Sequence, residues 1–128
     1  MIERFGTHGT GPGGNPLPFA KAVRAGDFVF VSGQVGAGPD GEIVAGGIVE
    51  QTTRCIENIK GILELAGVGL EHVVKTTVWL DDLRDFWSMN RVYAGYFGEH
   101  LPTRSCVQAR LVVDCKIEIE VTAYAPKV

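Results

Sequence analysis

Cysteine is scarce in this chain, and its pattern excludes two kinds of small stabilised protein. The 128 residues include three cysteines, at Cys55, Cys106 and Cys115. An odd number of widely spaced cysteines does not form the paired framework of a disulfide-rich domain. Structural zinc sites use closely spaced ligands, and the sequence contains no CxxC or CxxH spacing. We therefore expect reduced thiols and no bound metal.

Runs of basic residues and long apolar segments are also missing. Twelve basic residues are scattered among 15 acidic ones, and the formal net charge is -3. Proteins that bind nucleic acid cluster Lys and Arg against the phosphates, so we do not expect nucleic acid as a partner. No apolar stretch is long enough to cross a bilayer, and no basic segment followed by an apolar run opens the sequence. These features predict a cytoplasmic protein that does not enter membranes.

Glycine is abundant, with 17 residues that gather near the N-terminus. Residues 1–15 are predicted to form a glycine-rich arm, within a single domain that spans residues 1–128. Gly9, Gly11 and Gly14 match the spacing GxGxxG. A dinucleotide site needs a strand before this motif and a helix after it. Pro12 interrupts the motif, and more prolines follow, so we do not predict nucleotide binding.

Periodicity predicts the first elements. Residues 27–32 are a continuous run of β-branched and aromatic residues, which is typical of a strand buried on both faces. From Gly47 to Ala66 the apolar residues recur at helical spacing, so an amphipathic helix is expected, with Gly67 at its C-cap. Gly61 inside this helix indicates close packing against a neighbour. Residues 73–80 alternate and predict a strand, with Val74 on its apolar side.

The last third of the chain repeats the pattern of helix and strand. Asp82 is a plausible N-cap for a second helix that ends by Glu99. Residues 104–111 and 116–124 are predicted as strands, and the second alternates strictly between apolar and polar positions. The sequence therefore predicts an α+β fold, in which two helices pack on one face of a mixed β-sheet. The other face is free for assembly, and a tryptophan on it, Trp79, is typical of interfaces.

Several short segments, read in order, resemble the RidA family, which is also named YjgF or perchloric-acid-soluble protein. They are Val31-Ser32-Gly33-Gln34, Asn58-Ile59, Ala66-Gly67, Val74-Lys75-Thr76-Thr77-Val78, Asp85-Phe86 with Asn90, Pro102-Thr103-Arg104-Ser105-Cys106-Val107 and Lys116-Ile117-Glu118-Ile119-Glu120. The resemblance covers residues 16–125. It implies a chorismate-mutase-like fold, a homotrimer with clefts between subunits, and hydrolysis of enamines or imines to keto acids and ammonia without a cofactor.

The resemblance also implies roles for seven residues. Arg104 matches the arginine that binds the substrate carboxylate, and Glu118 matches the glutamate that holds the attacking water. Ser32, Gly33, Asn90 and Cys106 match residues that line the cleft. Phe19 stands where the family usually has tyrosine, in Leu17-Pro18-Phe19-Ala20-Lys21-Ala22. Phenylalanine lacks the hydroxyl, which indicates a divergent branch acting on another imine or on an amino-muconate-like compound.

The chemistry fits these residue types, and three alternatives stay open. Arginine binds a carboxylate through two parallel charge-assisted bonds, and a carboxylate beside a water can accept its proton. Glu120 has the same strand phase as Glu118, so alternation cannot choose between them. A trimer that binds a small carboxylate without turnover would use the same residues. The third possibility is an endoribonuclease, which the formal net charge of -3 disfavours.

Overall fold

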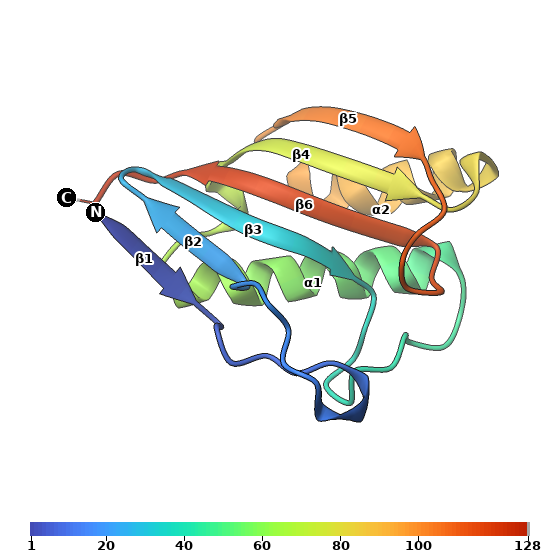
Figure 1. The fold of residues 1–128 in the computed structure, drawn as a ribbon. Coiled ribbons are helices and arrows are strands. Elements are labelled where there is room, and N and C mark those ends of the chain that lie inside the picture. Colours follow the sequence, from blue (N-terminus) through green and yellow to red (C-terminus); the bar gives the residue numbers. More distant parts are fainter. Residues whose placement is uncertain (128) are drawn as a thin grey trace.

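The computed structural model describes residues 1–127, which form a six-stranded sheet and two long helices (Figure 1). The strands are β1 (Ile2–Phe5), β2 (Ala22–Ala25), β3 (Phe28–Val35), β4 (Val73–Leu80), β5 (Thr103–Gln108) and β6 (Ile117–Tyr124). The helices are α1 (Ile48–Leu65) and α2 (Phe86–Phe97), with short 3₁₀ turns at Pro12–Gly14, Leu70–His72 and Leu83–Asp85. The strand order is β1-β2-β3-β6-β4-β5. The β4–β5 pair is parallel and the other four pairs are antiparallel, so the predicted mixed sheet is confirmed.

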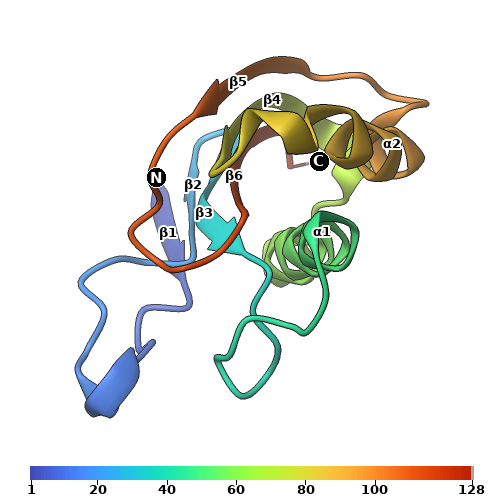
Figure 2. The ribbon, with the colours of Figure 1, turned by 90° about the vertical axis from the view of Figure 1, so that its right-hand side faces the viewer.

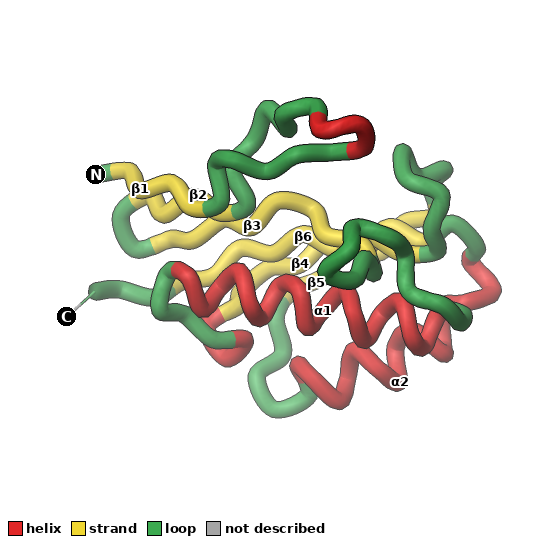
Figure 3. Tube along the Cα trace, turned by 90° about the horizontal axis from the view of Figure 1, so that it is seen from below, coloured by secondary structure: helices red, strands yellow, loops and turns green. Residues whose placement is uncertain are grey.

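Both helices cover the same face of the sheet, as predicted. The end-on view in Figure 2 shows α1 and α2 on the inner side of the curved sheet. Figure 3, from below, shows the two helices side by side across the strands. The opposite face, which we call the open face, has no helix over it among residues 1–127.

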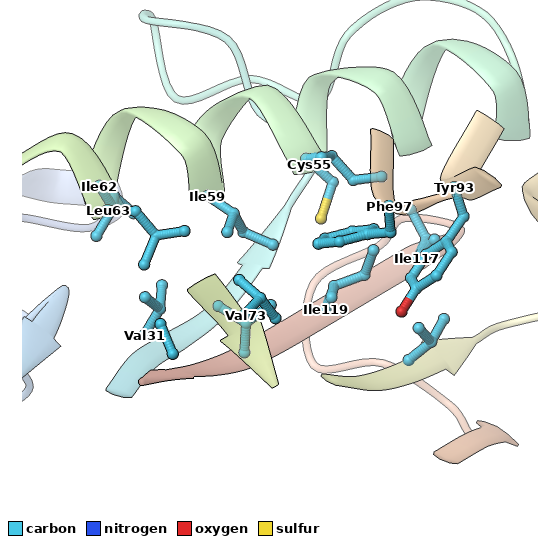
Figure 4. Packing of buried hydrophobic residues seen from close by; sticks show 14 of the residues in the cluster. Val31, Cys55, Ile59, Ile62, Leu63, Val73, Tyr93, Phe97, Ile117 and Ile119 are labelled. Atoms are coloured by element: carbon cyan, nitrogen blue, oxygen red, sulfur yellow. The ribbon is translucent and has the colours of Figure 1, made fainter. Parts of the chain in front are cut away.

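The core lies between α1 and the central strands. Cys55, Ile56, Ile59 and Leu63 of α1 are fully buried, and Figure 4 shows the labelled ones pointing at strand residues such as Ile119. Burial of such aliphatic side chains stabilises the fold by roughly 1.5–3 kcal/mol each. Gly67 has a φ of 72°, which confirms the left-handed position predicted at the end of α1. At the start of α1, Glu50 accepts a hydrogen bond from the Gly47 N–H at 2.8 Å, which lowers the pKa of Glu50.

The predictions for β4, α2 and β6 are also confirmed in outline. On β6 the apolar positions are buried, whereas Glu118 is half-buried and Glu120 is exposed. Asp82 caps the 3₁₀ turn at Leu83–Asp85 by accepting from the Arg84 N–H at 2.9 Å, and α2 follows that turn. The strand expected over residues 104–111 ends at Gln108 because β5 pairs with β4, and β4 ends opposite it at Leu80.

Four details differ from the sequence predictions. Within the predicted arm over residues 1–15, Ile2–Phe5 forms β1, which pairs with β2, a strand the sequence analysis did not predict. The strand expected to be buried on both faces is buried on one, since Phe28 and Phe30 are 41% and 46% exposed. Val74 is exposed because the β4–β6 register shifts between Val73 and Lys75. A Cβ added at Gly61 would meet no atom within 4 Å, so close packing does not explain this glycine within the described residues.

Candidate active site

Arg104 lies on the edge strand β5, and α2 holds its guanidinium group. In the parallel register Arg104 is opposite Thr76, which is buried beneath the helices, so Arg104 is also on the helix-covered face. Its Nη1 donates to Asn90 Oδ1 at 2.8 Å. The guanidinium carbon is 4.8 Å from the Tyr93 ring centre and 5.6 Å from the Phe86 ring centre. Such contacts restrain a guanidinium and leave its remaining N–H groups free to donate.

Buried polar contacts in turn hold the Tyr93 ring in place. The hydroxyls of Tyr93 and Thr76 are 2.7 Å apart, and both side chains are buried. Burial raises the pKa of Tyr93, so the phenol stays neutral. No carboxylate forms an ion pair with Arg104 among residues 1–127. Arg104 therefore presents a fixed positive charge that can receive an anionic group.

Cys106 lies two residues along β5 from Arg104 and faces the same way. Burial raises the pKa of the Cys106 thiol, and Arg104 opposes that shift only in part. A thiol acts as a nucleophile in its ionised form, so this environment favours a protonated, unreactive cysteine. We call Asn90, Arg104 and Cys106 the arginine cluster.

Glu118 lies on the open face, above a gap in the side chains of β3. Two residues, Ser32 and Gly33, stand between the Val31–Val121 and Gln34–Ile119 pairs, where β6 has only one residue. A Cβ on Gly33 would clash with Glu118 Oε2 and lie 3.1 Å from Glu118 Cδ. The missing side chain of Gly33 is what leaves room for the carboxylate. The pKa of Glu118 is raised, first by burial and then by the nearby charge of Glu120.

Ser32 ties the loop before β2 to this region. Its Oγ donates to the Ala20 carbonyl at 2.7 Å, and its backbone N–H donates to the Lys21 carbonyl at 3.0 Å. Phe19 precedes Ala20 in this loop and is 49% exposed. We call Phe19, Ser32, Gly33 and Glu118 the glutamate cluster.

The two clusters lie on opposite faces of the sheet. On β4, the neighbouring residues Val78 and Trp79 point to opposite faces. Val78 is buried under the helices and pairs with Cys106 of β5, so Cys106 and Arg104 share the helix-covered face. Trp79 pairs with Glu118 of β6, so Glu118 lies on the open face. Neighbouring residues along a strand point to opposite faces. One copy of the chain therefore does not bring Arg104 and Glu118 together.

Three residues around Arg104 were not predicted as part of the site. Phe86, Met89 and Tyr93 of α2 surround the guanidinium together with Asn90. Their spacing of three and four residues from one another places them on one face of the helix. That spacing was visible in the sequence, but the approach of β5 to this face was not.

Residues 1–127 contain neither a cluster of metal ligands nor a membrane-spanning helix. No group of three or more His, Cys, Asp or Glu side chains is arranged to hold a metal ion within residues 1–127. None of the helices in that range is both long and apolar enough to span a bilayer.

Known proteins resemble this chain over most of its length. Residues 15–125 match the family described as Endoribonuclease L-PSP. A RutC family protein of Pyrococcus abyssi is 54% identical over 109 residues, which is 84% of this chain and 86% of that protein. The 2-iminobutanoate/2-iminopropanoate deaminase of Salmonella typhimurium is 43% identical over 110 residues, 83% of this chain and 86% of that protein.

Solved structures share the fold as well. The crystal structure of Escherichia coli TdcF with bound serine superposes with a TM-score of 0.81 at 39% identity, covering 94% of this chain and 96% of TdcF. This likeness and the observed topology confirm the predicted α+β, chorismate-mutase-like fold.

Proposed function

Because the chain belongs to the RidA (YjgF, L-PSP) family, we propose that it is a cofactor-independent deaminase that hydrolyses reactive enamines and imines. The substrates are small carboxylates, either 2-aminoacrylate-like or amino-muconate-like, and the products are keto acids and ammonia. One observation carries the proposal: Arg104 is held by Asn90 and two aromatic rings with no carboxylate partner among the described residues. A fixed guanidinium of this kind suits a substrate carboxylate.

The proposed reaction needs orientation and one proton acceptor. Arg104 binds the carboxylate, which places the neighbouring imine carbon beside a water held by Glu118. The water oxygen bonds to that carbon while its proton passes to Glu118, and the C=N electron pair moves to nitrogen. Glu118 then returns that proton to the nitrogen, which completes the amino alcohol. The new hydroxyl next passes its own proton to the nitrogen through the same carboxylate, the C–N bond breaks with release of ammonia, and the keto group forms. Proton transfer by a positioned carboxylate contributes about 10²–10⁴-fold to the rate, a modest demand that an already reactive imine makes reasonable.

We further propose that the site forms between subunits of a homotrimer. The opposite placement of the two clusters supports this, because an Arg104 and a Glu118 can meet only if they come from different copies. The open face also carries Phe28, Phe30 and Tyr124, which are 41–46% exposed, and the Phe28 and Tyr124 rings pack edge to face at 5.2 Å. An exposed aromatic surface of this kind is typical of subunit interfaces.

Phe19 gives the glutamate cluster an apolar margin where the family usually has a hydroxyl. The Ser32 hydroxyl donates its one hydrogen bond to the Ala20 carbonyl, so toward a ligand it can act only as a hydrogen-bond acceptor. The serine bound to TdcF supports a ligand with the size of an amino acid. The three free thiols fit the cytoplasmic location that we propose for the protein.

Mixed trimers test the proposal directly. Arg104→Ala and Glu118→Ala proteins are each expected to lose at least about 100-fold in kcat/KM on imines generated by an amino-acid oxidase. The two variants are then co-expressed with different tags and purified through both tags. In a ring of three that contains both variants, one of the three junctions joins an intact Arg104 to an intact Glu118.

The expected activity of such mixed trimers is about one third of wild type per trimer. No recovery would contradict a site shared between subunits. Full activity in either single variant would contradict the role given to that residue. Light scattering should report three times the mass of one chain, and a stable monomer would overturn the trimer.

Two other functions remain testable with the same proteins. A trimer that only binds small carboxylates would bind a 2-keto acid in calorimetry, in an Arg104-dependent way, without accelerating the decay of any imine. The matched family carries the name of an endoribonuclease, but the net charge of -3 makes RNA a poor ligand. RNA cleavage that survives in both alanine variants would come from another site or from a contaminant.

A further inference from the structure

A hollow of about 400 Å³ lies next to the arginine cluster, between the start of α2 and the ends of β4 and β5. We call it the side-chain pocket. It is lined by Leu80, Leu83, Arg84, Phe86, Trp87, Cys106, Val107 and Gln108. Phe86 and Cys106 are also neighbours of Arg104, since the Phe86 ring centre is 5.6 Å from the guanidinium carbon. The pocket therefore adjoins the arginine cluster through Phe86 and Cys106.

Arg84 and Gln108, two polar residues that line the pocket, already make hydrogen bonds. Arg84 donates to both oxygens of Asp82 at 2.7–3.1 Å, and the pKa of Asp82 falls to about 2 as a result. The Gln108 side-chain oxygen accepts from the Leu83 N–H at 3.1 Å. A charged or strongly polar ligand group would have to compete with these bonds, whereas an apolar group would not.

Most of the residues that line the pocket are apolar, and three of these are exposed. Trp87 is 71% exposed, Leu83 is 66% exposed and Val107 is 48% exposed. An exposed tryptophan and an exposed leucine beside a hollow form an apolar surface that is stabilised when an apolar ligand group buries it. The volume is within the range of small-molecule pockets, roughly 300–1,000 Å³.

We propose that the side-chain pocket receives the apolar side chain of a 2-imino acid whose carboxylate is bound by Arg104. This inference rests on the proposed function and names its substrate class: imines of the larger aliphatic and aromatic amino acids are preferred over the imine of alanine. In such a molecule the side chain leaves the carbon next to the carboxylate. Phe86 contacts the Arg104 guanidinium and also lines the pocket, so a side chain one carbon away from the bound carboxylate is next to the pocket.

A series of imines with growing side chains tests the inference. The imines of alanine, 2-aminobutyrate, norvaline and leucine are generated by an amino-acid oxidase, and kcat/KM is measured for each with wild-type protein. Each added methylene is expected to raise kcat/KM about fourfold to tenfold until the pocket is filled. The Trp87→Ala protein should lower the ratio of leucine imine to alanine imine about tenfold. Leu101→Ala is the matched control, because Leu101 is 78% exposed and does not line the pocket, so the ratio should not change.

Binding of stable 2-keto acids separates the two proposals. Calorimetry with pyruvate and 4-methyl-2-oxopentanoate should show tighter binding of the larger acid, and this preference should fall in Trp87→Ala protein. If no imine is hydrolysed but this preference is seen, the proposed deaminase fails and the pocket stands. If imines are hydrolysed with kcat/KM that is flat or falls with side-chain length, the pocket assignment is overturned and the deaminase stands. A Trp87→Ala protein with an altered oligomeric state and an unchanged ratio would show that a second copy of the chain covers the pocket, which also overturns the assignment.

Discussion

Gly33 offers the sharpest single test of the glutamate cluster. An alanine at this position places its methyl group against Glu118 Oε2 and 3.1–3.3 Å from Glu118 Cδ and Cγ. The carboxylate must then move by about 1 Å, and misplacement on that scale costs roughly 100-fold in rate when orientation carries the catalysis. The backbone of Gly33 does not have a positive φ, so alanine adds no backbone strain there. Its effect on the free energy of unfolding should stay within about 1 kcal/mol.

The assay compares kcat/KM on one imine for wild type, Gly33→Ala and Gly95→Ala. Gly95 is the matched control because a Cβ there meets no atom within 4 Å and α2 accepts alanine readily. We expect the loss of kcat/KM in Gly33→Ala alone. Thermal unfolding should be close to wild type in Gly33→Ala and slightly higher in Gly95→Ala, because α2 gains a better helix former. Wild-type kcat/KM in a folded Gly33→Ala protein would show that the position of the Glu118 carboxylate does not matter for the reaction.

Three further predictions concern charge, pH and stability. Arg104→Lys keeps the positive charge but loses the planar pair of donors, so KM for the imine should rise about tenfold or more while folding is unchanged; an unaltered KM would contradict bidentate binding. The raised pKa of Glu118 means that its ionised form destabilises the fold, so wild-type stability falls as pH rises from 4.5 through that pKa. The melting temperature of Glu118→Gln should therefore exceed that of wild type more at pH 7 than at pH 4, and the opposite trend would refute the shift. Wild-type kcat/KM should in turn fall as pH drops through the same pKa, because the base must be ionised. Gly61→Ala should raise the free energy of unfolding by about 0.5–1 kcal/mol, since α1 gains a better helix former in open space, and destabilisation in urea melts would reveal a contact from another subunit.

Much of the fold follows from periodicity, and the exceptions have physical causes. α1, β4 and β6 are long enough for their spacing to show which residues are buried, and their bounds were predicted closely. β1 and β2 have four residues each, too few for a clear alternation, and they exist because they pair with one another and with β3. The expectation that residues 27–32 are buried on both faces was wrong, because helices cover only one face of β3 among residues 1–127. Whether a strand face is covered depends on how helices pack on the sheet, which the strand's own sequence does not determine.

For the site, too, some features could be predicted from the sequence and others required the tertiary structure. The resemblance to the RidA family, carried by residue types and their order along the chain, predicted Arg104 and Glu118 as site residues and a carboxylate as the ligand. Glu118 and Glu120 share a phase, so only the bulge at Ser32 and Gly33 distinguishes the half-buried carboxylate from the exposed one. Which face each side chain occupies depends on how β4 aligns with β5 and with β6, and pairing register is set by contacts between segments far apart in the chain. For that reason the separation of Arg104 and Glu118 to opposite faces became visible only in the tertiary structure.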